Sequence, residues 1–154
     1  MKYIPFLKKI TSETIRDLTS FGNPIVLLIV SIIFLGINIK IISIIIGLIT
    51  VELFCIIIKY FLHRERPKKE NYENTIERIN AGSFPSLHSA RSSFVFSSLL
   101  LISTVLSQKI FFLILILIVG ITRILMKKHY ISDVIAGYII GIGFSLLFNY
   151  LKFF

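Results

Sequence analysis

The chain has 154 residues, a length that suits one domain rather than two. Hydrophobic residues make up 55% of it and charged residues only 16%, against about 25% charged residues in a typical soluble domain, so the composition argues against a water-soluble enzyme. The formal net charge of +9 favours anionic partners, and because the apolar sequence offers no soluble scaffold for nucleic acid, we predict membrane lipids and a phosphorylated lipid as partners, with no nucleic acid.

The first 21 residues are predicted to form an amphipathic helix that lies in the membrane interface. Apolar side chains recur at helical spacing with lysines on the opposite face, which is typical of interfacial helices. The apolar positions are Ile4, Phe6, Leu7, Ile10, Ile15 and Leu18. The sequence Gly22-Asn23-Pro24 is expected to end this helix and begin the next. We expect no cleaved signal peptide, because no apolar core precedes residue 24.

Five apolar segments follow, and each is predicted to be a membrane-spanning helix. They cover residues 24–39, 41–61, 86–106, 110–126 and 134–151. Each is close to the length that crosses about 30 Å of hydrocarbon at about 1.5 Å per residue. Helices are expected despite the many isoleucines, since open strands leave unpaired backbone groups in lipid. We therefore predict an all-α integral membrane bundle of about five transmembrane helices, in a single domain over residues 1–154 with its helical core over 22–154.

Residues 63–85 form the one long polar connection between these segments and are predicted to be a loop. Loops carry function more often than the scaffold that positions them. We therefore expect this connection to contribute to the active site.

Two glycines in the last apolar segment, Gly137 and Gly141, have the small-xxx-small spacing that lets helix backbones approach closely. We expect them to pack within the chain rather than between copies, so a monomer is favoured. Cys55, the one cysteine, lies in an apolar run and is expected to be a small buried residue.

Charged and imidazole side chains lie where they are costly, at the ends of the predicted membrane helices. Each charge costs roughly 2.5–3.5 kcal/mol on insertion scales. Counting the crossings brings six such residues to one membrane face: Lys59, Arg66, His88, Arg123, His129 and Asp133. The three cations suit a phosphate. A histidine beside a carboxylate suits an activated nucleophile, and a second histidine suits protonation of a leaving oxygen.

Three short motifs connect these residues. Lys59 is followed by six residues and then Arg66-Pro67; Pro85-Ser86-Leu87-His88 comes next; Arg123, five residues, His129, three residues and Asp133 come last. Each motif alone is a weak or moderate signal, but all three in this order, at helix ends on one face, make a strong one. The set resembles the three-part signature of the type 2 phosphatidic acid phosphatase family, which is related to vanadium haloperoxidases and bacterial acid phosphatases.

The resemblance implies the residues that bind the substrate. Lys59, Arg66 and Arg123 would bind the phosphate oxygens, and the Ser86 hydroxyl and the backbone N–H of Leu87 would add hydrogen bonds. Leu87 stands where the family usually has glycine, so we expect a positive φ to be costly there and the phosphate loop to be adjusted. Its side chain would narrow the pocket or touch the lipid.

The resemblance also implies the catalytic residues. His129 would attack phosphorus and form a phosphohistidine, Asp133 would hold His129 in the correct tautomer, and His88 would protonate the leaving group. Preset cations would then supply most of the charge stabilisation. The family needs no metal, and we expect no metal and no cofactor here. Thr122 stands where the third motif usually has serine, and its hydroxyl is expected to substitute.

These implications favour a membrane-bound phosphatase that hydrolyses a phosphomonoester or pyrophosphate of a lipid. The candidate substrates are isoprenoid pyrophosphates, phosphatidylglycerol phosphate, phosphatidic acid and the phosphate of a lipid A-type glycolipid. Two alternatives stay open: a phosphotransferase that uses the same phosphohistidine, and a non-catalytic protein that binds or transports lipid phosphates.

The membrane is expected to be the cell (inner) membrane. Lysine and arginine gather on the motif side, which by the positive-inside rule indicates a cytoplasmic active site. Many relatives act on the outer face, and some of these charges are also substrate ligands, so the outer face is slightly favoured. Arg91 is expected to form a buried salt bridge rather than a phosphate contact, Glu52 to be a protonated or paired structural residue, and His63 to be solvated.

Overall fold

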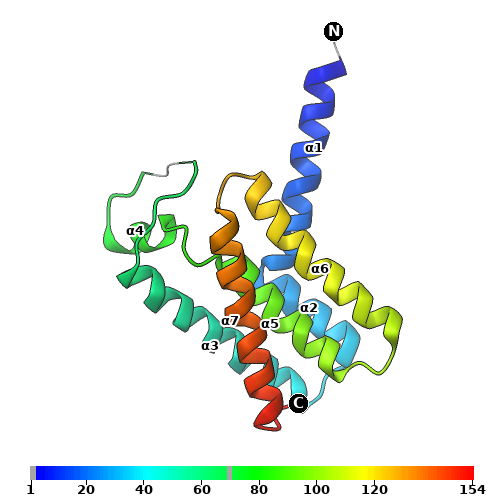
Figure 1. Cartoon of the computed structure of the whole chain (residues 1–154). Helices are drawn as coiled ribbons and strands as arrows, with labels where there is room; N and C mark the ends of the chain where they lie inside the picture. The colour runs from blue at the N-terminus through cyan, green and yellow to red at the C-terminus, as the bar shows by residue number, and fades with distance from the viewer. Residues whose placement is uncertain (1–2, 69–70) are drawn as a thin grey trace.

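The computed structural model describes the backbone of residues 3–68 and 71–154, and the side chains of these ranges from residue 11 onward. Within these ranges every regular element is a helix (Figure 1), which confirms the prediction of an all-α bundle. The elements are α1 (Tyr3–Thr19), a 3-10 turn η1 (Ser20–Gly22), α2 (Pro24–Leu35), α3 (Ile39–Phe61), α4 (Thr75–Ala81), α5 (Leu87–Ile102), α6 (Leu106–Leu125) and α7 (Ile131–Tyr150).

The helix α5 lies at the centre of the bundle, against α3, α6 and α7 (Figure 1). Ten of its 16 residues are buried, as expected for a helix that has no hydrophilic face. Phe94, Phe96 and Leu99 belong to the apolar core that these helices share with α2. Because α5 is packed along its whole length, its first turn is held in a fixed position.

Gly137 and Gly141 bring α7 against α5. A Cβ on Gly137 would lie 2.6 Å from the Ser86 carbonyl oxygen, and one on Gly141 would lie 2.3 Å from that of Ala90. Both distances are far below van der Waals contact. The expectation that this glycine pair packs within the chain is therefore confirmed.

By length and composition, fewer helices qualify as full membrane spans than the five predicted segments. Among the described residues, three helices are long and apolar enough to cross a membrane, namely α3, α6 and α7. A fourth span results if α2 is joined to the end of α1, since the two form an apolar pair bent by 67°. The helix α5 is apolar but has only 16 residues, or about 24 Å at about 1.5 Å per residue. Each of the five predicted segments does contain a helix.

The ends of several elements also differ from the prediction. The helix α2 stops at Leu35, because Gly36 adopts a φ of 69° that breaks the helix. The polar connection over residues 63–85 is not a plain loop, since it contains α4. Asn74 precedes this helix and caps it, since its side chain accepts the Glu77 N–H at 2.8 Å. The Asn74–Glu77 pair is a capping arrangement that is visible in the sequence.

The helix α1 extends beyond the bundle at the same end as α4, the end opposite the C-terminus (Figure 1). Its last turns pack against α6. The interfacial position of this helix stays a prediction. The C-terminus lies at the opposite end of the bundle (Figure 1).

Candidate active site

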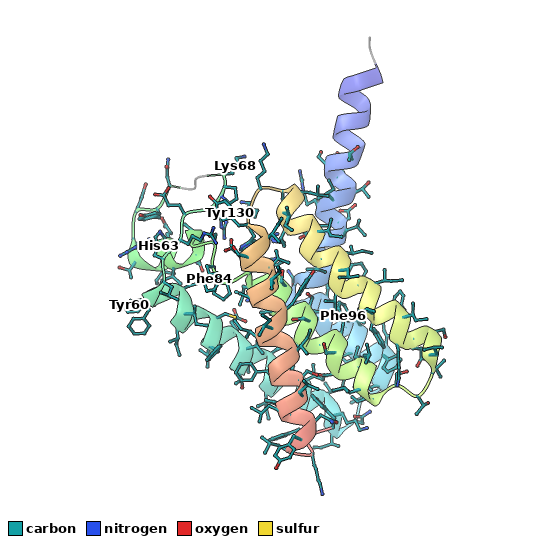
Figure 2. All side chains as sticks on the ribbon, viewed as in Figure 1. Tyr60, His63, Lys68, Phe84, Phe96 and Tyr130 are labelled. Atoms are coloured by element: carbon teal, nitrogen blue, oxygen red, sulfur yellow. The ribbon has the colours of Figure 1, made fainter. Side chains whose placement is uncertain are left out.

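One end of the bundle encloses a cavity of about 250 Å³ among α3, α5 and the connection from α6 to α7. Its lining residues are Glu52, Ile56, Lys59, Arg66, Asn80, Leu87, His88, Arg91, Arg123 and His129. Five of the six residues predicted to converge therefore line one cavity, and Asp133 lies behind His129. Figure 2 shows His63, Phe84 and Tyr130 at this end of the bundle, while Phe96 lies further along the helices.

Two of the cations are held by backbone carbonyls at the end of α4. Lys59, buried in the last turn of α3, donates from Nζ to the Gly82 carbonyl oxygen at 2.5 Å. Arg66 donates from Nη2 to the Asn80 carbonyl oxygen at 2.6 Å. Their heads are therefore positioned by the segment that joins α4 to α5.

The third cation, Arg123, contacts the end of α1. Its Nη1 donates to Thr19 Oγ1 at 3.2 Å, and the Thr122 hydroxyl oxygen lies 3.1 Å from the same atom. The Thr122 hydroxyl also reaches the Val119 carbonyl at 2.7 Å. Thr19 was not anticipated, because it lies 104 positions from Arg123 in a segment that carries no family motif.

Ser86 and Leu87 begin α5, and the structure changes what was expected of both. Leu87 is the first residue of the helix and does not adopt a positive φ, so the absence of glycine costs nothing there. Leu87 lines the cavity, whereas Ser86 is fully buried outside it. The Ser86 hydroxyl lies 2.8 Å from the Ser89 hydroxyl and caps the helix. A hydrogen bond from Ser86 to phosphate requires this hydroxyl to turn.

His88 lines the cavity from the first turn of α5. A Cβ on Gly22 would lie 2.7 Å from His88 Cβ and 2.8 Å from Cδ2 of its ring. The bend between α1 and α2 therefore sits directly against this imidazole. This contact positions His88, and only a glycine leaves room for it.

His129 has its Nδ1 atom 2.7 Å from the Ser83 carbonyl oxygen. A carbonyl only accepts hydrogen bonds, so Nδ1 carries the proton and the lone pair lies on Nε2. Asp133 Oδ2 is 3.9 Å from the same Nδ1 atom, within ion-pair range but beyond hydrogen-bond distance. Both acceptors favour the tautomer in which the lone pair lies on Nε2. Ser83 was missed in the sequence because backbone acceptors leave no residue signature.

Burial, and then the positive charges of Arg123 and Lys59, lower the pKa of His129 from its ordinary 6.5 to about 2. The ring is therefore neutral at physiological pH. A neutral imidazole is the form that can attack phosphorus.

Arg64 is a further cation that the motifs do not include. It donates from Nη1 to Asp133 Oδ1 at 2.9 Å. The buried carboxylate of Asp133 therefore has a cationic partner besides its histidine neighbour.

Arg91 forms an ion pair with Glu52, and both residues line the cavity. The expectation of a salt bridge at Arg91 and of a paired Glu52 is confirmed. His63, which was expected to be solvated, has both ring nitrogens buried without a hydrogen-bond partner among the described residues, and its ring lies edge-on to Tyr72. The solvated position predicted for His63 is therefore wrong, because α4 folds over it.

The comparisons with known proteins concern the fold and the family of the chain. A search of curated proteins found no match. A crystal structure described as that of the first transmembrane PAP2-type phosphatidylglycerolphosphate phosphatase from Bacillus subtilis superposes with a TM-score of 0.71 at 19% sequence identity, over 91% of this chain and 75% of that one. The likeness confirms the fold of a transmembrane helical bundle. The model of the PAP2 superfamily matches residues 40–154, which include all three motifs. This chain therefore belongs to the PAP2 superfamily.

Proposed function

We propose that this membrane protein hydrolyses a phosphomonoester or pyrophosphate of a lipid through a phosphohistidine on His129. One observation carries the proposal. The hydrogen bond from His129 Nδ1 to the Ser83 carbonyl directs the ring so that Nε2 is the nucleophile, at the wall of a cavity that Lys59, Arg66 and Arg123 also line.

In the first step, His129 Nε2 attacks phosphorus, a P–N bond forms and the P–O bond to the lipid breaks. His88, which holds a proton when the phosphate anion is bound beside it, donates that proton to the leaving oxygen. The three cations stabilise the charge that builds up on the equatorial oxygens. A water molecule then attacks phosphorus and His88 accepts its proton; a P–O bond forms, the P–N bond to His129 breaks, and inorganic phosphate leaves. These steps use protein side chains and water alone.

Phosphatidylglycerol phosphate is the substrate to test first, because the similar crystal structure is described as a phosphatase of that lipid. Phosphatidic acid, an isoprenoid pyrophosphate and a lipid A-type phosphate complete the panel. Each presents a terminal phosphate on an apolar body, as the cavity beside the membrane helices requires.

The test is release of inorganic phosphate from this panel by purified protein in detergent with a chelator. We expect turnover of at least one lipid, an acid-labile phosphorylated protein during turnover, and loss of both in His129→Ala and Arg123→Ala protein. Lys109→Ala is the matched control, since Lys109 lies at the other end of the helix that carries Arg123. Retained activity without His129 contradicts the proposal. Phosphate transferred to a second lipid indicates a phosphotransferase, and binding without turnover indicates a carrier.

A further inference from the structure

We propose that Arg64 is a positioning residue that holds both acceptors facing His129 Nδ1. The inference rests on the proposed function, because it concerns how the nucleophile of that reaction is oriented. Arg64 lies between the two ends of the first motif and has no role in the phosphate-binding set described above.

The side chain of Arg64 holds the segment that begins α7. Its Nη1 donates to Asp133 Oδ1 at 2.9 Å and to the Ser132 hydroxyl at 2.7 Å. The guanidinium carbon lies 4.1 Å from the centroid of the Tyr130 ring, a cation–π contact. The guanidinium group of Arg64 therefore contacts Tyr130, Ser132 and Asp133 at once, and these contacts hold the start of α7 in place.

The Asp133 carboxylate is held at both oxygens. Its side chain is 0% exposed, whereas that of Arg64 is 45% exposed. Oδ1 accepts from Arg64, and Oδ2 accepts the Tyr130 N–H at 2.8 Å. A buried carboxylate needs such partners to stay ionised. With the carboxylate fixed in this way, Oδ2 faces His129 Nδ1 at 3.9 Å.

The backbone of Arg64 holds the other acceptor. Its carbonyl oxygen accepts the Ser83 N–H at 2.7 Å, and the Ser83 hydroxyl donates to the Glu65 carbonyl at 3.1 Å. Ser83 is thereby fixed with its own carbonyl 2.7 Å from His129 Nδ1. One residue thus positions the carbonyl through its main chain and the carboxylate through its side chain.

This arrangement has a consequence for the reaction. As His129 bonds to phosphorus, its ring gains positive charge, and a carboxylate becomes a better partner for Nδ1–H than a neutral carbonyl. Arg64 keeps the carboxylate ready for that moment. Without the side chain, Asp133 loses its cation and its fixed orientation, while Lys59, Arg66 and Arg123 still bind the phosphate. Loss of Arg64 therefore lowers kcat and leaves KM nearly unchanged.

The experiment compares Arg64→Ala, Arg64→Lys and wild-type protein with the best lipid phosphate. We expect kcat to fall about 10- to 100-fold in Arg64→Ala, the range found for carboxylates that orient metal-bound histidines, with KM within about twofold. Arg64→Lys should recover part of the loss. Added guanidinium ion should restore part of the Arg64→Ala rate, because the site is open to solvent. Arg78→Ala, which removes an exposed arginine from α4, is the matched control. Its kcat should equal that of the wild type, and added guanidinium ion should not change it.

A rise in KM at unchanged kcat overturns the inference, since Arg64 would then bind substrate, and so does an unchanged kcat. A second readout does not depend on turnover. In protein labelled with ¹⁵N-histidine, the Nδ1–H signal of His129, identified by its loss in His129→Gln, should shift between the wild type and Arg64→Ala, because the carboxylate that faces Nδ1 is released. The Ser83 carbonyl, which the main chain of residue 64 holds, should keep the proton on Nδ1 in both proteins. An Nδ1–H signal that does not move also overturns the inference. Absence of phosphate release by the wild type contradicts the proposed function instead.

Discussion

In the proposed reaction, the charge on His129 decides whether its ring can attack phosphorus, because only the neutral imidazole has a free lone pair. Burial and the cations around the cavity lower its pKa to about 2, so protonation requires a pH far below the physiological range. We expect the ring signals of His129 in an NMR titration of the substrate-free protein to show no inflection between about pH 5 and about pH 8. An inflection near the ordinary value of about 6.5 contradicts this prediction.

Gly22 is predicted to be required for catalysis although it has no functional group. In Gly22→Ala, the new Cβ meets His88 at 2.7 Å, so the imidazole has to leave the position from which, in the proposed reaction, it protonates the leaving oxygen. We expect kcat to fall about 10- to 100-fold, within the contribution usual for a general acid, in steady-state assays of lipid phosphate hydrolysis. Gly143→Ala serves as the control, because a Cβ there meets nothing within 4 Å. Equal rates in the two variants count against this role of Gly22.

The residues of the site divide into those that sequence can identify and those that it cannot. Lys59, His88 and His129 were found because charges at membrane helix ends are rare and their spacing forms motifs. Ser83 and Thr19 were not found. Ser83 acts through a backbone carbonyl 46 positions from its histidine, and Thr19 through a hydroxyl 104 positions from its arginine. Contacts of this kind depend on the packing of the whole bundle and leave no local pattern.

At the scale of elements, the close contact of α5 and α7 is predicted to limit stability. Gly141→Ala places a Cβ 2.3 Å from the Ala90 carbonyl oxygen. A backbone carbonyl inside a helix cannot move aside as the end of a flexible side chain can. Overpacking of this kind costs about 1–3 kcal/mol. We expect a lower midpoint of thermal unfolding in detergent than for the wild type. Gly143→Ala, two residues further along α7, should leave the midpoint unchanged. Equal midpoints for the two variants would show that the α5–α7 contact does not limit stability.

The helices themselves followed from the sequence more readily than their ends. Long apolar runs predict where α3, α6 and α7 lie, since only a helix satisfies its backbone in lipid. The early end of α2 at Leu35 depends on the φ of Gly36. The φ of an isolated glycine cannot be predicted from the sequence. The helix α4 was overlooked because seven residues are too few to show periodicity. Its cap at Asn74 was the available signal.

At the scale of the whole molecule, the orientation in the membrane is predicted from two opposing arguments. The end that holds the cavity is rich in lysine and arginine, which favours the cytoplasm. However, Lys59, Arg66 and Arg123 are there as proposed substrate ligands, so they are poor markers of topology. We expect the cavity on the outer face and the C-terminus, which lies at the other end of the bundle (Figure 1), in the cytoplasm. A fluorescent-protein fusion at the C-terminus should therefore be bright and an alkaline phosphatase fusion inactive, and the reverse result places the cavity inside.

The carbonyl groups of Asn80 and Gly82 have a consequence for the affinity of the proposed site for phosphate. A lysine or arginine side chain carries about 2 kcal/mol of rotamer entropy, and here the heads of Lys59 and Arg66 are already ordered by those carbonyls. These two side chains therefore lose their conformational freedom when the chain folds and not when a lipid binds. Binding of a phosphate is then stronger although no contact has been added. In the proposed function it also ties phosphate affinity to the folding of α4, a short helix that Asn74 and Glu77 cap together.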